Sequence, residues 1–170
     1  MGSAIQSVAD PGTFGATTVR IYSEGYHRCA ERRRTAMKMS EAQFKAIRER
    51  VGLSQKAVAE RLGNTVDMVK KWENPKYTYQ PPADACDLLA QALDAHVGSV
   101  RRQVAEIRDK ADGRPIEVEL VYFRSQPQHD AYTSDGMDWE VVNARTREVA
   151  VLVEQLGIGT VVFRYPENLQ

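Results

Sequence analysis

The sequence predicts a mainly α-helical protein, with a five-helix domain followed by a small α+β module of strand, helix and strand. Two observations lead to this fold class. Between residues 40 and 113, apolar residues recur at helical spacing in stretches that glycines separate. Between residues 116 and 165, two stretches rich in β-branched and aromatic residues flank one longer helical stretch. We therefore divide the chain into a flexible basic leader, the helical domain with its connecting helix, and the α+β module, at residues 1–39, 40–113 and 114–170.

Composition and cysteine usage predict a cytoplasmic protein without a cofactor or a metal. Of the 170 residues, 42% are hydrophobic and 27% are charged, which is ordinary for a globular chain. No apolar run is long enough to cross a membrane, and the N-terminus lacks the apolar block of a secretory signal. Cys29 and Cys86 lie far apart without ligand-spaced partners, which indicates buried or idle thiols rather than a zinc site or a disulfide framework.

Charge is distributed unevenly along the chain. The net charge is zero, which at first argues against a nucleic-acid partner. Basic residues nevertheless outnumber acidic ones in residues 1–39, and the acidic excess lies in residues 114–170. The earlier parts of the chain are therefore free to meet phosphates.

The leader permits two interpretations. It has a possible short strand at Thr17–Tyr22 and a basic cluster of Arg28, Arg32, Arg33, Arg34 and Lys38. The cluster is either a basic arm that follows DNA, or a solvated tail or upstream extension, since Met37 and Met39 are both plausible natural starts. We favour the tail on composition.

Three short helices are predicted between residues 40 and 73. Ser40 and Gln43 form a capping-box pattern that opens the first helix, and Gly52 ends it. Ser54 caps the second helix and Gly63 ends it. Asn64 and Thr65 form the next turn, and Thr65 caps the third helix. The residues expected to face the core are Phe44, Ile47, Val51, Val58, Ala59, Leu62, Val69 and Trp72.

Two short helices joined by a glycine turn are typical of a helix-turn-helix, in which the second helix enters the major groove of DNA. A proline-rich loop follows, in which Tyr77 and Tyr79 either contact sugar-phosphate or pack on the next helix. We expect that helix at Ala83–Ala95 and a separate connecting helix from Ser99 to Gly113.

The C-terminal module begins with a strand at Ile116–Arg124 and a polar loop at Ser125–Gly136. A helix capped by Asp138 is expected at Trp139–Leu156, although Val149–Val153 is apolar enough for a strand. The last strand is Thr160–Tyr165. A module of about 50 residues is too small to bury a sheet on both faces, so we expect a homodimer through this domain.

Residues 46–63 read AIRERVGLSQKAVAERLG, and after nine residues Glu73-Asn74 stands where Glu-Asn-Gly is usual. With these motifs, residues 44–95 resemble the Cro/CI-like (XRE) helix-turn-helix repressors. The longer span 44–165 has Asp112-Gly113-Arg114-Pro115 before the first strand and Trp139 on the late helix. In that layout it is similar to the anti-CRISPR-associated autorepressors and related bacterial proteins.

The resemblance implies roles for individual residues. Arg48 and Glu73 would form a partly buried ion pair that holds the helices together. Gln55 and Thr65 would contact phosphates. Asn64 in the turn and Lys76 in the loop are also expected to bind DNA. The base-reading positions would be Val66, Asp67, Lys70 and Lys71.

The chemistry of these four side chains suits bases. A lysine can donate to guanine O6 and N7 or neutralise a phosphate, a valine can pack on a thymine methyl, and an aspartate can accept from cytosine N4. Asp67 departs from the polar or basic residues common at its position. It either discriminates against wrong bases or caps the third helix.

The expected function is sequence-specific repression of transcription, with a dimer on an inverted repeat of double-stranded DNA and its own operon as the target. The alternative is an antitoxin-like protein whose C-terminal module binds a partner protein. An enzyme is not expected, because the sequence brings no acid, base and nucleophile together: His27, His96 and His129 share no motif.

Overall fold

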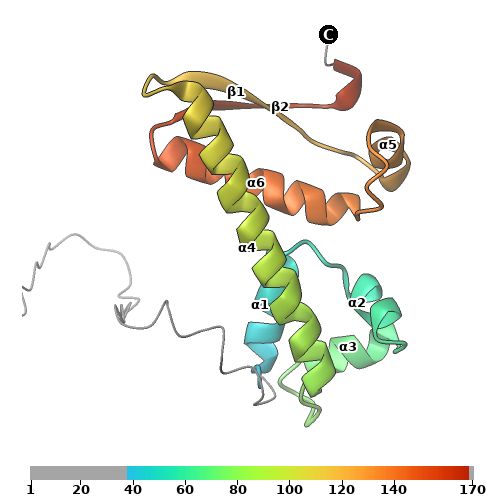
Figure 1. Ribbon diagram of the computed structural model, residues 1–170. Coiled ribbons are helices and arrows are strands. Elements are labelled where there is room, and N and C mark those ends of the chain that lie inside the picture. The colour runs from blue at the N-terminus through green and yellow to red at the C-terminus, as the bar shows by residue number, and fades with distance from the viewer. Residues whose placement is uncertain (1–37, 169–170) are drawn as a thin grey trace, which may run out of the picture. The chain divides into compact units, whose positions relative to one another are not determined.

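The computed structural model describes residues 38–168. The described chain contains α1 (Glu41–Arg50), α2 (Gln55–Arg61), α3 (Val66–Trp72), α4 (Ala83–Ala111), β1 (Ile116–Val121), α5 (Gln126–Tyr132), α6 (Trp139–Gln155) and β2 (Gly159–Arg164), as Figure 1 shows, and a 3₁₀ turn at Pro166–Asn168. The mainly α fold class with a small α+β module is confirmed. The predicted strand at Thr17–Tyr22, the basic cluster up to Arg34 and Cys29 lie outside the described residues.

Side-chain caps begin the first three helices as predicted. The hydroxyls of Ser40, Ser54 and Thr65 each accept a hydrogen bond from the backbone N–H three residues ahead, at 3.2, 3.1 and 3.2 Å. Such bonds satisfy N–H groups that have no partner inside a helix. The boundaries of α1, α2 and α3 are therefore fixed locally, before any tertiary contact is considered.

Glycines end α1 and α2 in left-handed backbone conformations. Gly52 has φ 77° and Gly63 has φ 60°. After each glycine the chain closes a Schellman motif: the Leu53 N–H donates to the Arg48 carbonyl at 3.0 Å, and the Asn64 N–H donates to the Ala59 carbonyl at 2.8 Å. These turns set the angle at which the next helix leaves.

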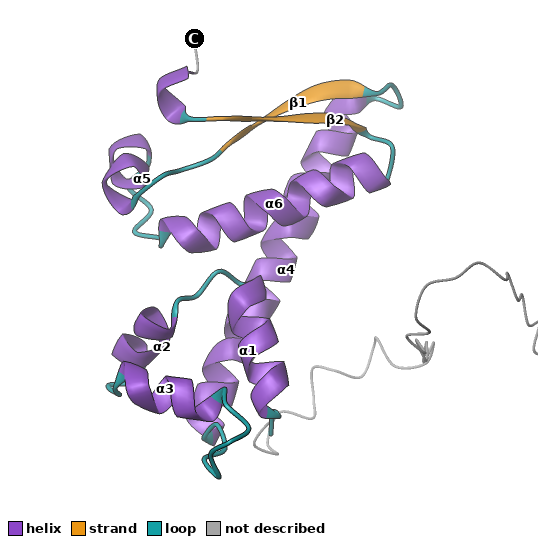
Figure 2. Cartoon of the chain, turned by 180° about the vertical axis from the view of Figure 1, so that it is seen from behind, coloured by secondary structure: helices purple, strands orange, loops and turns teal. Residues whose placement is uncertain are grey.

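The helices predicted at Ala83–Ala95 and Ser99–Gly113 are one continuous helix, α4, so the predicted break is wrong (Figure 2). The buried stripe runs through the supposed break without interruption, because His96 occupies a core position between Leu89 and Val100. A glycine inside a helix costs only about 1 kcal/mol relative to alanine. Packing along the whole length outweighs that cost at Gly98.

β1 and β2 form a parallel two-stranded sheet, with Val118 opposite Val161 and Leu120 opposite Phe163. Between them α6 covers the predicted range, so the alternative of a strand at 149–153 is wrong. The polar loop expected at residues 125–136 is also wrong in part, because α5 forms there with Ser125 before it and Pro127 in its first turn.

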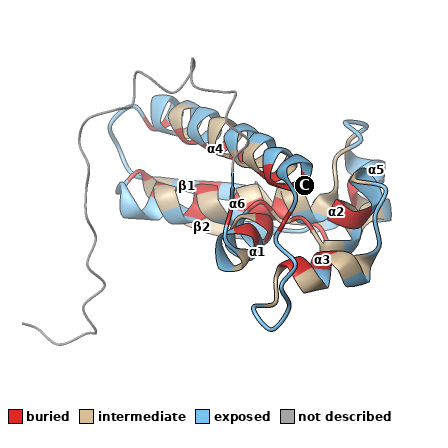
Figure 3. Ribbon diagram, turned by 90° about the horizontal axis from the view of Figure 1, so that it is seen from below, coloured by how far each residue is buried: buried red, intermediate tan, exposed pale blue. Residues whose placement is uncertain are grey.

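Two clusters of buried residues make up the core, and α4 contributes to both (Figure 3). The first cluster joins α1, α2, α3 and the start of α4 around Phe44, Val58, Val69 and Leu89. It also contains Met39, the last residue of the predicted leader. The second joins the end of α4 to α6 and the sheet, with Val100, Val118, Val149 and Val153.

Cys86 lies within the first cluster, and burial raises the pKa of its thiol. A protonated, buried thiol behaves as a small apolar side chain.

The helical domain and α6 are in direct contact. A Cβ added at Gly52 would lie 2.4 Å from the Glu140 carbonyl oxygen, so only glycine allows the turn after α1 to approach α6 this closely. Arg50 donates to the Glu148 carboxylate at 2.6 Å, and Arg61 donates to Asp138 at 2.6 Å. Two ion pairs and a glycine contact therefore join residues that the sequence analysis placed in separate domains.

Candidate nucleic-acid interface

The third helix presents one face to the core and another to solvent. Val69 and Trp72 are buried, and the Trp72 ring packs edge-on against Phe44 at 6.0 Å between centroids. On the opposite side the Asp67 side chain is 82% exposed and Lys70 is also exposed. Val66 and Lys71 are half-buried. Asp67 and Lys70 are thus on the face of α3 that the core leaves accessible, whereas Lys71 is partly accessible and Val66 packs in part against the core.

The turn before α3 is polar, ordered and exposed. The Asn64 side-chain oxygen accepts a hydrogen bond from the Thr65 N–H at 3.0 Å, while the Thr65 hydroxyl caps α3. Both residues are exposed. The start of a helix attracts phosphate because its first N–H groups point outward and its dipole is positive there.

Asp67 does not cap α3, since the Thr65 hydroxyl performs that role. Its carboxylate instead lies 3.3 Å from the Lys70 ammonium. Both groups are exposed, so the pair contributes little to stability. It does hold a hydrogen-bond acceptor and a donor side by side on the solvent face of the helix.

The loop after α3 supplies aromatic and basic groups. The Lys71 ammonium lies 5.6 Å from the centroid of the Tyr79 ring, within the range of a cation–π contact. Tyr77 and Tyr79 are both about half exposed, so neither ring is buried against the next helix. Lys76 is exposed, and its backbone N–H donates to the Asn74 side chain at 3.0 Å.

A buried ion pair joins α1 to the end of α3. Arg48 donates from Nε and Nη2 to the two carboxylate oxygens of Glu73, at 2.5 and 2.9 Å, and from Nη1 to the Leu53 carbonyl at 2.9 Å. The Arg48 and Glu73 side chains are only 9% and 4% exposed. The planar fork of an arginine matches a carboxylate in this geometry, so the pair fixes α3 against the rest of the domain.

Gln55 belongs to the same network, a role that the sequence does not predict. It is the first residue of α2, and its side-chain amide donates to Glu73 at 2.8 Å. The bond uses its amide nitrogen and orients the side chain at the start of α2. No pattern in the sequence distinguishes this role from a phosphate contact.

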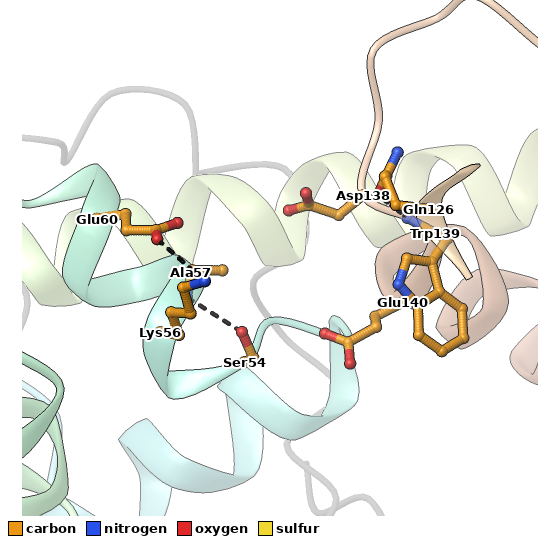
Figure 4. A pocket seen from close by; sticks show the side chains of 8 residues that line it. All are labelled: Ser54, Lys56, Ala57, Glu60, Gln126, Asp138, Trp139 and Glu140. Carbon is orange, nitrogen blue, oxygen red and sulfur yellow. Dashed lines mark hydrogen bonds and ion pairs between the residues drawn. The ribbon is translucent and has the colours of Figure 1, made fainter. Parts of the chain in front are cut away.

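A pocket of about 180 Å³ lies between α2 and the start of α6 (Figure 4). Ser54, Lys56, Ala57 and Glu60 face Gln126, Asp138, Trp139 and Glu140 across it. Most of its polar groups already have partners: Ser54 caps α2, Lys56 lies 3.7 Å from Glu60, and Gln126 accepts from the Trp139 N–H. The pocket therefore has little polar chemistry left to offer a ligand.

The described part of the chain contains no group of three His, Cys, Asp or Glu side chains that could hold a metal ion. No helix within residues 38–168 is both long and apolar enough to cross a membrane.

Residues 44–98 match the sequence profile of the helix-turn-helix family. These residues are a Cro/CI-like helix-turn-helix domain. In this domain α2 and α3 are the paired helices, and the Gly63 turn joins them. A search of curated proteins gave no match to the chain. The helix-turn-helix domain makes the protein a DNA-binding regulator, and it spans α1, α2, α3 and the first half of α4.

Proposed function

We propose that the protein is a sequence-specific transcriptional repressor that binds an inverted repeat as a homodimer. The observation that carries this proposal is the exposed surface of α3, held in place by the buried Arg48–Glu73 pair. A helix fixed on one side and polar on the other is suited to a major groove. The resemblance to autorepressors makes the protein's own operon the target, in the cytoplasm.

Direct contacts to bases would come from the exposed start and middle of α3. Lys70 and Lys71 would donate to guanine, and Val66 would pack on a thymine methyl. The Asp67 carboxylate, already 3.3 Å from Lys70, would accept from a cytosine amino group while Lys70 donates to a neighbouring guanine. This pair would therefore read two neighbouring bases, one that donates a hydrogen bond and one that accepts it.

Contacts to phosphate would fix the register of α3 in the groove. The exposed Asn64 and Thr65 lie at the start of α3, and Lys76 lies in the loop that follows it. Gln55, at the start of α2, would donate to a phosphate only if its amide leaves Glu73 or shares its second hydrogen. DNA binding would then compete with, or extend, the network that holds α3.

A dimer is proposed because one α3 offers few base contacts. Two copies of α3 about one turn of DNA apart, roughly 34–36 Å, would read the two halves of an inverted repeat. Residues 114–170 would hold the two copies together, and the ion pairs from α1 and α2 to α6 would transmit their spacing to the DNA-binding surface.

Footprinting on the DNA that flanks the gene tests this function. We expect protection of two half-sites related by two-fold symmetry, with binding that weakens steeply as salt increases. Lys70→Ala and Lys71→Ala should each weaken binding, whereas Lys110→Ala, which removes an exposed charge at the far end of α4, should not. No salt-sensitive binding, or equal binding by all three variants, would refute the proposal.

A partner protein is the second candidate, because the C-terminal module exposes large apolar side chains at Tyr132, Val151, Leu156 and Phe163. An antitoxin-like role would cover them with another protein, and the helix-turn-helix domain would then regulate the shared operon. Co-purification of a small protein at fixed stoichiometry would favour this role, and a homodimer in light scattering would count against it.

A further inference from the structure

The sheet of the C-terminal module ends at β2 on one side. Within residues 38–168 the sheet has two strands, fewer than a sheet needs to be stable by itself. Ile116 at the start of β1 donates to the Ile158 carbonyl at 3.2 Å, and Tyr122, just after β1, donates to the Arg164 carbonyl at 2.8 Å. Backbone groups alternate in direction along a strand, so Val161 and Phe163 direct theirs away from β1. These groups are ready to pair with another strand.

The Phe163 side chain lies on the face of the sheet that the helices cover, but the side chain itself is exposed. It is two residues after Val161, which packs in the second cluster, so both side chains point to the same face. Phe163 is nevertheless 48% exposed, and its ring contacts the Tyr122 ring edge-on at 5.6 Å. About half of the Phe163 side chain is therefore left for another apolar surface to cover.

The open edge of β1 differs in charge from that of β2. On β1 the residues that direct their backbone groups outward include Glu117 and Glu119. Two copies of β1 paired antiparallel would place these carboxylates opposite one another, which is destabilising. Charged residues on an edge strand protect it from pairing. Only the β2 edge is therefore suited to a second copy.

The chain after β2 turns toward the chain after β1. Glu167 accepts a hydrogen bond from Gln128 at 2.6 Å and forms an ion pair with Arg124, whose guanidinium also lies over the Tyr165 ring at 4.4 Å. These contacts draw residues 165–168 to the β1 side. Within the described chain they do not cover the free edge of β2.

We propose that the β2 strands of two copies pair antiparallel about a two-fold axis at Val162 and form one four-stranded sheet. The proposal rests on the homodimer in the proposed function and names its interface. Val162 would face Val162 of the second copy, Val161 would face Phe163, and Thr160 would face Arg164. The outward backbone groups of Val161 and Phe163 would then exchange hydrogen bonds, as alternate residues do in an antiparallel pair.

This register agrees with the exposure of Phe163. A two-fold axis perpendicular to the sheet keeps the helices of both copies on the same face. Phe163 would then lie beside Val161 of the second copy, and aromatic side chains paired with β-branched ones stabilise a sheet. Arg164, which already donates to Glu119 at 3.1 Å, would lie on the opposite face, where it can remain hydrated.

A cysteine crosslink tests the register. Val162 bonds its backbone groups to β1, so across the axis it would form a pair without mutual hydrogen bonds, with Cα atoms about 4.5 Å apart. That separation falls within the range of about 4.4–6.8 Å that a disulfide spans. In full-length protein carrying Cys29→Ser, with the buried Cys86 retained, we expect Val162→Cys to form disulfide-linked dimers on mild oxidation.

Two variants serve as matched controls: Glu117→Cys on the edge of β1 and Val151→Cys at an exposed position on α6. On a non-reducing gel, both should migrate as single chains without a disulfide crosslink. Light scattering of the unmodified protein should give the mass of a dimer. Crosslinking of either control in place of Val162→Cys would overturn the proposal, as would an unmodified protein that is monomeric at micromolar concentration.

The same samples separate this proposal from the proposed function. A monomeric protein that still shows salt-sensitive binding to a half-site would overturn the β2 pairing and leave DNA binding intact. Val162→Cys dimers that show no salt-sensitive binding to the flanking DNA would support the β2 pairing and refute the repressor.

Discussion

Arg48 contributes more to the domain than an ordinary surface arginine would. Three of its nitrogen atoms donate to Glu73 and to the Leu53 carbonyl, and the Leu53 N–H donates back to the Arg48 carbonyl. One residue therefore holds the turn after α1 and the end of α3 in place. A buried pair of this kind is costly to break from one side only, because the remaining charge loses its partner.

Glu73→Gln should destabilise the protein by about 3 kcal/mol or more, since it leaves Arg48 buried without a counter-charge. The free energy of unfolding in urea measures the effect. In the double variant Arg48→Met with Glu73→Leu, the free energy of unfolding should fall by less than the sum of the losses caused by Arg48→Met alone and Glu73→Leu alone. Lys45→Ala is the control, because its 3.9 Å pair with Glu49 is exposed on both sides. A Glu73→Gln protein as stable as that control would contradict the importance of the pair.

Glu148 links three helices, because it accepts from Arg50 on α1 and lies 2.8 Å from Nε2 of the buried His96 on α4. The hydrogen bond from Arg50 is the main reason that the pKa of the Glu148 carboxyl lies below its usual range, although partial burial opposes it. A carboxylate with a lowered pKa in the folded state stabilises that state above its unfolded pKa, and the stabilisation is lost as the pH falls.

Glu148→Gln should therefore be less stable than the unmodified protein near neutral pH, and the difference should shrink below pH of about 4, where free glutamate becomes protonated. Urea unfolding of both proteins over a series of pH values measures the difference. Glu154→Gln, an exposed substitution on the same helix, should show no such trend. A difference that does not change with pH would mean that the charge of Glu148 is not what stabilises the fold.

Among the elements, α4 connects the two clusters of the core without interruption. Gly98 lies inside it with no atom within 4 Å of an added Cβ, whereas Gly52 has a positive φ and almost touches the backbone of α6. The two glycines therefore have opposite requirements, although both lie near an expected helix end.

Gly98→Ala should stabilise the protein by about 0.5–1 kcal/mol, because alanine loses less conformational freedom in a helix. Gly52→Ala should destabilise it, since a Cβ would lie 2.4 Å from the Glu140 carbonyl oxygen. Thermal unfolding of the two variants should show shifts of opposite sign in the melting temperature. A melting temperature lowered by Gly98→Ala would indicate that α4 is broken at that residue.

The predictability of each element depends on how local its signal is. Caps at Ser54 and Thr65 and the turn at Gly63 determine α2 and α3, so these helices follow from the sequence. The continuity of α4 depends on His96, a polar residue in a core position. The only buried residue of α5 is His129, so its sequence shows little apolar periodicity. Tertiary contacts determine whether these residues are buried, and a local sequence pattern does not reveal such contacts.

The site follows the same rule. The Arg48–Glu73 pair was expected through the resemblance, and the exposure of Lys70 follows from the helical period. The hydrogen bond from Gln55 to Glu73 joins residues 18 positions apart. Spacing in the sequence does not report which side chains meet, so this bond cannot be predicted from it.

At the scale of the whole molecule, the proposed dimer doubles every contact to DNA. Neutralising one phosphate changes the slope of log K against log salt by about 0.9. Lys76→Ala should therefore reduce the slope by roughly 2 if two copies bind together, and by roughly 1 if a single copy binds. Titrations of labelled operator at several salt concentrations distinguish the two values. An unchanged slope would mean that Lys76 does not contact phosphate.

Because α4 contributes residues to both clusters of the core, unfolding of this helix in one cluster would expose apolar residues of the other. We expect the chain to unfold in a single cooperative transition, as small domains commonly do. Its two tryptophans allow a direct comparison, since Trp72 is in the first cluster and Trp139 begins α6. Each single-tryptophan variant, Trp139→Phe and Trp72→Phe, should unfold in urea with the same midpoint by tryptophan fluorescence as by circular dichroism. Separate transitions would make the two halves independent folding units.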